Sequence, residues 1–185
     1  MSSWHKKRTV IHRYDTTAHL YDTRYLEEQV AKITAGLRHL DDKELGVVLD
    51  LGCGTGILID ELKDMAVEIV GADISRRTLL EARKRTENAH RAHLVLADAD
   101  NTPFKENVFD SVFAVTLLQN MPDPHLTLKE MKRVSKAKAV FVVTGLKRVF
   151  SLESLKRLLK REDLAVLALE AEGLRCHIAV CKKMQ

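Results

Sequence analysis

Alternating glycines between residues 50 and 56 are the feature of this sequence that points most directly to chemistry. The segment reads DLGCGTG, and Gly52, Gly54 and Gly56 allow the backbone to turn sharply and to approach a ligand closely. A helix expected from residue 56 presents its free N–H groups at the same place. A tight turn without a ligand is the alternative, but three alternating glycines cost chain entropy without adding packing. The spacing therefore predicts a small-molecule site.

The charge of this loop indicates the kind of ligand. Its spacing differs from the G-x-G-x-x-G of dinucleotide sites and the G-x-x-x-x-G-K-[ST] of phosphate loops, and it contains no Lys or Arg. Asp50 stands just before the first glycine, where a carboxylate disfavours a pyrophosphate and favours a cation. S-adenosylmethionine carries an ammonium and a sulfonium group and no phosphate, so it suits an acidic loop.

Two further acids end the next two expected strands. Asp73 ends the second strand, where a carboxylate can accept hydrogen bonds from both ribose hydroxyls. Asp98 ends the third strand, where it can reach the adenine amine. Each acid alone could be a common turn or capping aspartate, as we expect for Asp100. Together with Asp50, however, Asp73 and Asp98 end three consecutive strands and converge on one crevice.

Polar side chains in the loop AVTLLQNMPDP are the candidates for the acceptor side. The loop follows the fourth expected strand, so its residues should lie at the same edge of the sheet as the ligand crevice. Gln119 and Asn120 offer carbonyl oxygens that can accept a hydrogen from an amine and orient its nitrogen, so we interpret both as catalytic. No carboxylate precedes Asp123 in the loop, which argues against general-base removal of a proton. We expect His125 to be structural or solvated.

Short apolar runs alternate with amphipathic stretches along the chain. The near-continuous runs predict buried strands of a parallel sheet at 47–51, 67–73, 93–98, 109–115 and 138–145. Helices are expected at 15–40, 56–64, 75–88, 124–136 and 150–161, capped in two cases by Ser75 and by Ser151 with Ser154. The tail is expected to form a hairpin, because Gly173 interrupts it and HIAVC alternates like a strand. This alternation predicts an α/β doubly wound sheet with ligands beyond the carboxyl ends of its strands.

Three of these segments resemble one protein family. VLDLGCGTG, GADIS and LADADNTPFKENVFDSVFAV are similar to the motifs of class I S-adenosylmethionine-dependent methyltransferases. The resemblance implies a Rossmann-like, seven-stranded sheet, mostly parallel with an antiparallel C-terminal strand. It also implies one methyltransferase domain over 1–185, with a basic segment and lid helix at 1–40 and a cofactor-binding core at 45–185.

The resemblance also assigns the cofactor contacts. The acidic glycine loop would hold the methionine part, Asp73 the ribose, and Asp98 with Ala99 the adenine. The segment YDTTAHLYDTRY resembles the N-terminal helix of a subgroup with quinone-biosynthesis and tRNA- and rRNA-modifying members, in which an aromatic residue covers the cofactor. For Tyr14 and Tyr21, core packing at helical spacing is an almost equal alternative. The expected contacts are Tyr14, Tyr21, Asp50, Gly52, Cys53, Gly54, Gly56, Asp73, Ile74, Asp98, Ala99 and Thr116.

Three classes of function remain open, and the basic character of the chain favours one of them. The net charge is +4 with a pI of about 9.0, which is compatible with RNA. The cluster from His5 to Arg8 adjoins the expected lid and could bring phosphates to the transfer site. Few residues follow the fifth strand to close a small-molecule pocket. The sequence therefore favours methylation of a base nitrogen in rRNA or tRNA, although QNMP lacks a proline of the motif of base-amine methyltransferases. A small-molecule acceptor is the alternative, and a non-catalytic S-adenosylmethionine-binding subunit is the third interpretation.

Composition excludes further classes. The chain of 185 residues is 45% hydrophobic and 30% charged, as in globular proteins, and no apolar run approaches the ~18–20 residues that span a bilayer. The N-terminus has no apolar stretch of a secretory signal, so we expect a cytoplasmic protein without membrane contact. The three cysteines match no CxxC pattern, and we expect free thiols and no metal site. Such a minimal domain favours a homodimer or a small activating subunit.

Overall fold

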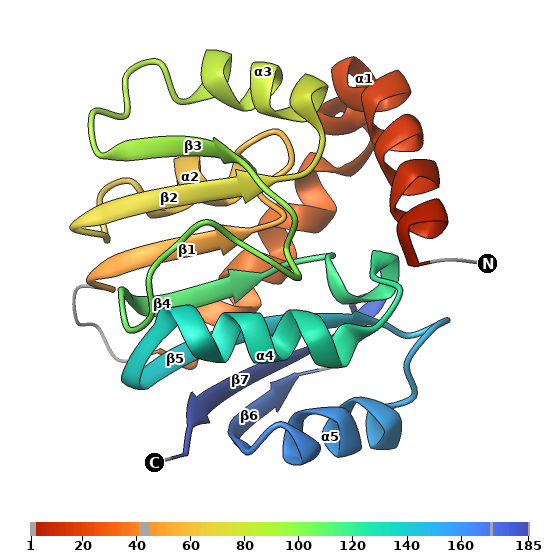
Figure 1. Cartoon of the computed structure of the whole chain (residues 1–185), viewed down its shortest axis with the longest axis vertical. Helices are drawn as coiled ribbons and strands as arrows, with labels where there is room; N and C mark the ends of the chain where they lie inside the picture. Colours follow the sequence, from red (N-terminus) through yellow and green to blue (C-terminus); the bar gives the residue numbers. More distant parts are fainter. Residues whose placement is uncertain (1–2, 41–44, 171, 185) are drawn as a thin grey trace.

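Seven strands form the single mixed sheet at the centre of the molecule (Figure 1). The computed structural model describes residues 3–40, 45–170 and 172–184. The strands are β1 Val47–Leu51, β2 Glu68–Asp73, β3 Ala92–Leu96, β4 Phe109–Ala114, β5 Ser135–Leu146, β6 Leu164–Glu170 and β7 Cys176–Lys183. Their order is β3-β2-β1-β4-β5-β7-β6. The first five pair in parallel, whereas β7 is antiparallel to both β5 and β6, which confirms the predicted sheet.

Helices cover both faces of this sheet, which explains why its strands are nearly continuous apolar runs. The helices after β1 are α2 Ile57–Leu62, α3 Arg76–Arg85, the 3₁₀ turn η1 Leu118–Asn120, α4 Pro124–Val134 and α5 Leu152–Arg161. Side chains of α4 and α5, such as Leu128 and Leu155, belong to one core cluster. Leu58 and Leu62 of α2 belong to the cluster on the other face. The four helices predicted after the first strand are therefore confirmed, with ends that differ by at most three residues.

Serine caps set the start of two helices. The Ser75 hydroxyl accepts a hydrogen bond from the Thr78 amide at 3.2 Å, and the Ser151 hydroxyl accepts one from the Ser154 amide at 3.1 Å. Both side chains therefore satisfy an amide that has no partner within the helix. The Ser154 hydroxyl instead donates to the Ser151 carbonyl, so only the first serine of that pair is the cap.

The N-terminal helix α1 is longer than the sequence predicted. It spans Ser3–Leu37, so the basic residues lie within the helix, and the expectation that they form a segment before it is wrong. Its last turns are anchored in the core by Ile33 and Ala35. Its first part lies beside the carboxyl ends of the strands, and the helix bends between the two parts (Figure 1). Hydroxyls of Thr16 and Thr17 donate to carbonyls of the preceding turn, a bond that often bends helices.

None of the helices within the described ranges combines the length and apolar character that crossing a bilayer requires.

Candidate functional site

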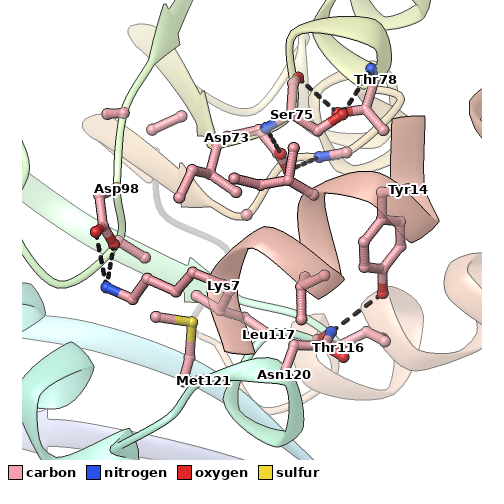
Figure 2. A pocket seen from close by; sticks show the side chains of 18 of the residues that line it. Lys7, Tyr14, Asp73, Ser75, Thr78, Asp98, Thr116, Leu117, Asn120 and Met121 are labelled. Carbon is pink, nitrogen blue, oxygen red and sulfur yellow. Dashed lines mark hydrogen bonds and ion pairs between the residues drawn. The ribbon is translucent and has the colours of Figure 1, made fainter. Parts of the chain in front are cut away.

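A pocket lies at the carboxyl ends of β1, β2 and β4, beneath the first half of α1 (Figure 2). It encloses about 780 Å³, including its open mouth. Most of the predicted site residues line it, namely Tyr14, Tyr21, Gly52, Gly54, Asp73, Ile74, Asp98, Ala99, Thr116 and Asn120. Four predicted residues are not part of its lining, namely Asp50, Cys53, Gly56 and Gln119. The crevice expected from the sheet is therefore where the fold places it.

In the glycine loop, backbone atoms without side chains line this pocket. Gly52 and Gly54 have φ angles of +80° and +53°, a conformation that residues with a Cβ rarely adopt. A Cβ on Gly52 would lie 2.9 Å from Leu117 Cδ1, whereas a Cβ on Gly54 would meet nothing within 4 Å. Gly54 therefore borders open space, and a ligand can approach its backbone directly.

The other two predicted loop residues have structural positions. Gly56, with a φ of +80°, is the N-cap of α2. A Cβ on Gly56 would lie 3.2 Å from the Ala82 side chain, so close packing between α2 and α3 accounts for this glycine. The Cys53 side chain is buried in the core cluster of α2, and burial holds the pKa of its thiol well above the usual range.

Asp73 connects the loop to the next strand. One carboxylate oxygen accepts a hydrogen bond from the Gly54 amide at 2.9 Å, and the other accepts one from the Ser75 amide at 2.8 Å. Burial raises the pKa of Asp73, while these two hydrogen bonds oppose the shift. The side chain remains partly exposed in the pocket lining, so it both braces the loop and presents an acceptor to a ligand.

Asp50 is buried beside the glycine loop, and one of its carboxyl oxygens lacks a partner among the described residues. That oxygen is Oδ2, and the residue is 2% exposed. Burial, followed by the nearby charge of Asp73, raises the pKa of Asp50 to about 8. A buried carboxylate without a partner is costly, and a cation placed beside it would remove that cost. This orphaned oxygen fits a ligand with a positively charged group.

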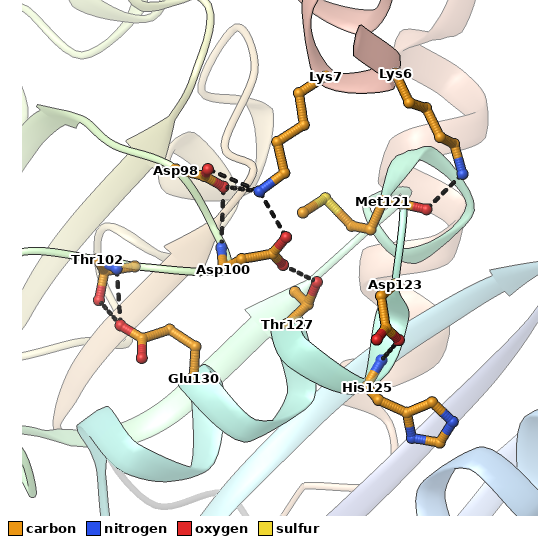
Figure 3. Close-up of polar contacts among 10 residues, drawn as sticks. All are labelled: Lys6, Lys7, Asp98, Asp100, Thr102, Met121, Asp123, His125, Thr127 and Glu130. Atoms are coloured by element: carbon orange, nitrogen blue, oxygen red, sulfur yellow. Dashed lines mark hydrogen bonds and ion pairs between the residues drawn. The ribbon is translucent and has the colours of Figure 1, made fainter. Parts of the chain in front are cut away.

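Lys7 is a pocket residue that the sequence reasoning missed. Its Nζ lies 2.7 Å from both oxygens of Asp98 and 2.6 Å from an oxygen of Asp100 (Figure 3). Asp100 lies in a turn, as expected, and its side chain also accepts a hydrogen bond from the Thr127 hydroxyl at 2.6 Å. Burial lowers the pKa of Lys7, but its bonds to the two carboxylates outweigh this and raise it overall. Lys7 therefore stays charged and neutralises the acids at this end of the pocket.

One face of α1 forms the roof of the pocket. Lys7, Val10, Ile11 and Tyr14 line it, and their spacing is that of one helical face. The rings of Tyr14 and Tyr21 have centroids 6.0 Å apart in a tilted arrangement. A helix predicted from the N-terminus, rather than from residue 15, would have placed Lys7 on the same face as Tyr14.

Polar contacts attach the roof to the sheet. The Lys6 ammonium donates to the Met121 carbonyl at 2.5 Å (Figure 3). Asp15 accepts a hydrogen bond from the Ser75 hydroxyl at 2.6 Å. Two turns further along α1, Asp22 accepts one from the hydroxyl of Thr55 in the glycine loop. Lys7 is buried against Asp98 and Asp100, so this member of the basic cluster is not available to bind phosphates, whereas Lys6 stays exposed despite its bond to Met121.

The loop after β4 places Asn120 between the roof and the sheet. Its amide nitrogen donates to the Tyr14 hydroxyl at 3.1 Å and to the Thr116 carbonyl at 2.9 Å (Figure 2). Its carbonyl oxygen accepts a hydrogen bond from Arg13 at 2.7 Å. Gln119 donates to the same Thr116 carbonyl at 2.7 Å, and its own buried carbonyl oxygen has no partner in the described part of the chain.

Thr116 itself has a strained backbone, with a φ of +62°. Its amide is held by the Thr144 hydroxyl at 2.7 Å, and its own hydroxyl donates to Gln29 and accepts from Lys32. These bonds offset the cost of the left-handed conformation. Strain fixed in this way is typical of functional sites.

A second cleft opens from the same place. It encloses about 1550 Å³, including its open mouth, between α1, the loop after β4, the turn after β5 and the segment before β7. The first pocket and this cleft share Tyr14, Tyr21, Thr116 and Asn120, and Gln119 lines the cleft. Two ligands, one in each cavity, would meet at these shared side chains.

Comparisons with curated proteins identify the family of this chain. A family model described as a methyltransferase domain matches residues 49–143. The chain is 34% identical over 109 residues to the demethylmenaquinone methyltransferase of Staphylococcus saprophyticus, an alignment that covers 57% of this chain and 47% of that relative. The chain thus spans about half the length of the curated relatives it matches.

Two solved structures share the fold. The 1,6-didemethyltoxoflavin-N1-methyltransferase of Burkholderia thailandensis, solved with 1,6-didemethyltoxoflavin and S-adenosylhomocysteine, matches with a TM-score of 0.84 at 14% identity, covering 100% of this chain and 92% of that one. A methyltransferase of Haloferax volcanii, solved with the activator Trm112, matches with a TM-score of 0.81 at 17% identity, covering 93% and 98%. Because the family match spans more than half of the chain and coincides with the strands that form the pocket, the chain belongs to the class I S-adenosylmethionine-dependent methyltransferases.

Proposed function

We propose that this protein transfers the methyl group of S-adenosylmethionine to a small-molecule acceptor bound in the second cleft. The observation that carries the proposal is the continuity of the two cavities at Tyr14, Thr116 and Asn120. A transferase must bring two ligands into contact, and positioning them is the main contribution of the protein to a displacement of this kind.

The residues of the first pocket suit the cofactor of this family. Asp50 and the glycine loop would hold the methionine part, whose ammonium would sit near the orphaned carboxyl oxygen. Asp73 would accept from the ribose hydroxyls, and Asp98 with Ala99 would face the adenine. When bound, S-adenosylmethionine supplies an electrophilic methyl group on its sulfonium. Tyr14 and Tyr21, on the roof, would exclude water from that group.

Asn120 and Gln119 are the proposed positioning groups for the acceptor. Asn120 borders both cavities, and a nitrogen acceptor would take the place of Arg13 at its carbonyl oxygen. Gln119 lines the cleft with a carbonyl oxygen that lacks a donor among the described residues. An amine hydrogen can satisfy either oxygen, so both side chains support an amine as the methylated group.

A small acceptor is favoured over RNA for two reasons. Lys7, one of the basic residues expected to contact phosphates, is buried against Asp98 and Asp100 instead. The named substrate of the similar staphylococcal enzyme, a demethylmenaquinone, is a small molecule. RNA remains the second candidate because the cleft is lined by arginines, which also bind phosphates. The structural likeness to a methyltransferase solved with an activator supports testing both acceptors with and without partner proteins.

The test is transfer of a labelled methyl group from S-adenosylmethionine to fractionated cell extract. We expect label in the fraction of small metabolites, identified by mass spectrometry, and none in tRNA or rRNA. Label in RNA nucleosides would replace the small-molecule acceptor with RNA. A protein that binds the cofactor but labels neither fraction, with extract proteins present, would favour the non-catalytic subunit.

A further inference from the structure

The charge of the second cleft identifies the chemical class of its ligand. We propose that the acceptor carries an anionic group, a carboxylate or a phosphate, that binds at the outer end of this cleft. The inference rests on the proposed function, because the cleft is the acceptor site only if the first pocket holds the cofactor. Among its described lining residues, one side chain is acidic, Glu28, and six are basic, namely Arg13, Arg24, Lys32, Lys147, Arg148 and Arg175.

The single carboxylate is already neutralised within the cleft. Glu28 lies 2.7 Å from the Lys32 ammonium and 3.9 Å from the Arg175 guanidinium. Lys32 is only 2% exposed and also donates to the Thr116 hydroxyl, so it belongs to the floor of the cleft. Arg13 donates to Asn120. These contacts hold the inner cations in place and leave no carboxylate of the described lining for Arg24 and Arg148.

The outer cations are placed to receive an anion from solution. Arg24 on α1 and Arg148 after β5 are exposed, and neither forms an ion pair with any residue that the structure describes. Lys147, next to Arg148, also lines the cleft, and its amide donates to the Arg175 carbonyl at 3.0 Å. Arginines from separate segments that converge on one hollow match the planar oxygen pairs of carboxylates and phosphates. A cleft lined mainly by positive charges also attracts anions and raises their local concentration.

The cleft has a direction that predicts the shape of the acceptor. Its inner end is the side chains shared with the cofactor pocket, and its outer end is the arginines. Tyr14 and Arg24 are roughly 15 Å apart along the path of a helix with a rise of 1.5 Å per residue. Along this path, the ring of Tyr21, which also borders the cofactor pocket, and the ring of Tyr25 have centroids 5.0 Å apart and line the cleft. The acceptor therefore has its nucleophile at one end, a planar or apolar middle and an anion at the other end.

Fragment binding tests the anionic end without knowledge of the acceptor. The protein, saturated with S-adenosylhomocysteine, is titrated with benzoate, phenyl phosphate and the neutral benzamide while backbone amide resonances are followed by NMR. We expect the two anions, and not benzamide, to shift resonances around Tyr25 and Arg148. The ratio of the two anion affinities then distinguishes a carboxylate from a phosphate group. Equal shifts with benzamide, or no shifts in the cleft with either anion, would overturn the inference.

Matched variants locate the anion. The double variant Arg24→Gln/Arg148→Gln should weaken binding of the anions by roughly three- to tenfold, as expected for exposed ion pairs. The control Arg157→Gln/Lys160→Gln removes two exposed cations of α5 and should leave the affinity unchanged. If the two double variants weaken binding equally, the loss reflects the net charge of the protein, and the proposed anion site is refuted.

Two further measurements separate this inference from the proposed function. Calorimetry with S-adenosylhomocysteine on the same samples should show unchanged binding in both double variants. If the cofactor product does not bind at all, the proposed function fails; if it binds and the anions do not, only the inference fails. Unfractionated tRNA is then added to the phenyl phosphate complex. Displacement of the probe with a steep salt dependence would replace the small anion with RNA.

Discussion

Asp73 is the residue on which the cofactor assignment depends most. Its two oxygens hold the Gly54 and Ser75 amides, so its carboxylate is fixed before any ligand arrives. Fixed acceptors bind with little loss of freedom, and charged hydrogen bonds contribute more than neutral ones. Thus the same contacts that shape the loop prepare the proposed ribose site.

The variant Asp73→Ala should weaken S-adenosylmethionine binding by about 1.5–3 kcal/mol, the range for hydrogen bonds to a charged group. Isothermal calorimetry measures the change, and circular dichroism verifies that the variant is folded. Asp64→Ala, which removes an exposed carboxylate outside the pocket lining, is the control. Unchanged affinity in a folded Asp73→Ala protein would refute the ribose assignment.

Asn120→Ala tests the positioning of the acceptor. Turnover should fall on the order of 10–1000-fold, because alignment and hydrogen-bond contributions of this kind are each worth a few kcal/mol. Cofactor affinity should remain nearly intact. Single-turnover transfer of a labelled methyl group, followed by mass spectrometry of the product, reports both the rate and the methylated atom. A methyl group on carbon or oxygen would contradict the amine assignment, and an unimpaired variant would contradict the role of Asn120.

At the scale of elements, α1 has two parts with different attachments. Its last turns are anchored by apolar packing around Ile33, whereas its first turns are fastened across the pocket by the ion pairs and hydrogen bonds of Lys6, Lys7 and Asp15. Polar contacts at a partly exposed edge are weakened by salt. The first part of α1 is therefore the element expected to open when the cofactor enters or leaves.

The substitution Lys7→Met should raise the dissociation rate of S-adenosylhomocysteine by roughly 10–100-fold, since a charged hydrogen bond is worth about 1.5–3 kcal/mol. Stopped-flow fluorescence with a competing ligand measures this rate. Arg8→Met removes an exposed cation of the same helical turn and should have little effect. Equal effects of the two substitutions would contradict a specific role for Lys7.

At the scale of the whole molecule, the cost of the buried Asp50 should appear as a pH dependence of stability. The pKa of Asp50 is about 8 in the folded protein and near the ordinary aspartate value of ~4 in the unfolded chain. Between these values the folded state binds a proton that the unfolded state lacks. The free energy of unfolding therefore decreases as pH rises from about 5 to 8.

Thermal denaturation of the ligand-free protein measures this slope. The variant Asp50→Asn should have a flatter dependence on pH, because it removes the titrating group. Two other acids affect stability only at lower pH, namely Asp110 and Glu130. Burial raises their pKa values, but Lys136 and Arg133 outweigh this and lower them overall. Their stabilisation is lost as the solution becomes acidic. An unchanged slope in Asp50→Asn would show that Asp50 is not the group responsible.

The sequence by itself determined the local parts of this protein. Near-continuous apolar runs located the strands because both faces of the sheet are covered, and Ser75 marked a helix start because it caps the chain locally. The loop with Gly52 and Gly54 was recognisable because its left-handed conformations require glycine. Signals of this kind are contained in a few consecutive residues.

Only the tertiary structure decided which distant side chains meet. Lys7 and Asp98 are 91 residues apart in the chain, and no local pattern shows that a surface-type lysine is buried beside two acids. The sequence placed Cys53 in the site, but its side chain is buried in a core cluster and is not part of the pocket lining. The second cleft depends on the bend of α1 and on the turn after β5 together. Long-range packing sets such contacts, because the free energy that fixes them comes from burial and pairing between segments rather than from conformational preferences within one.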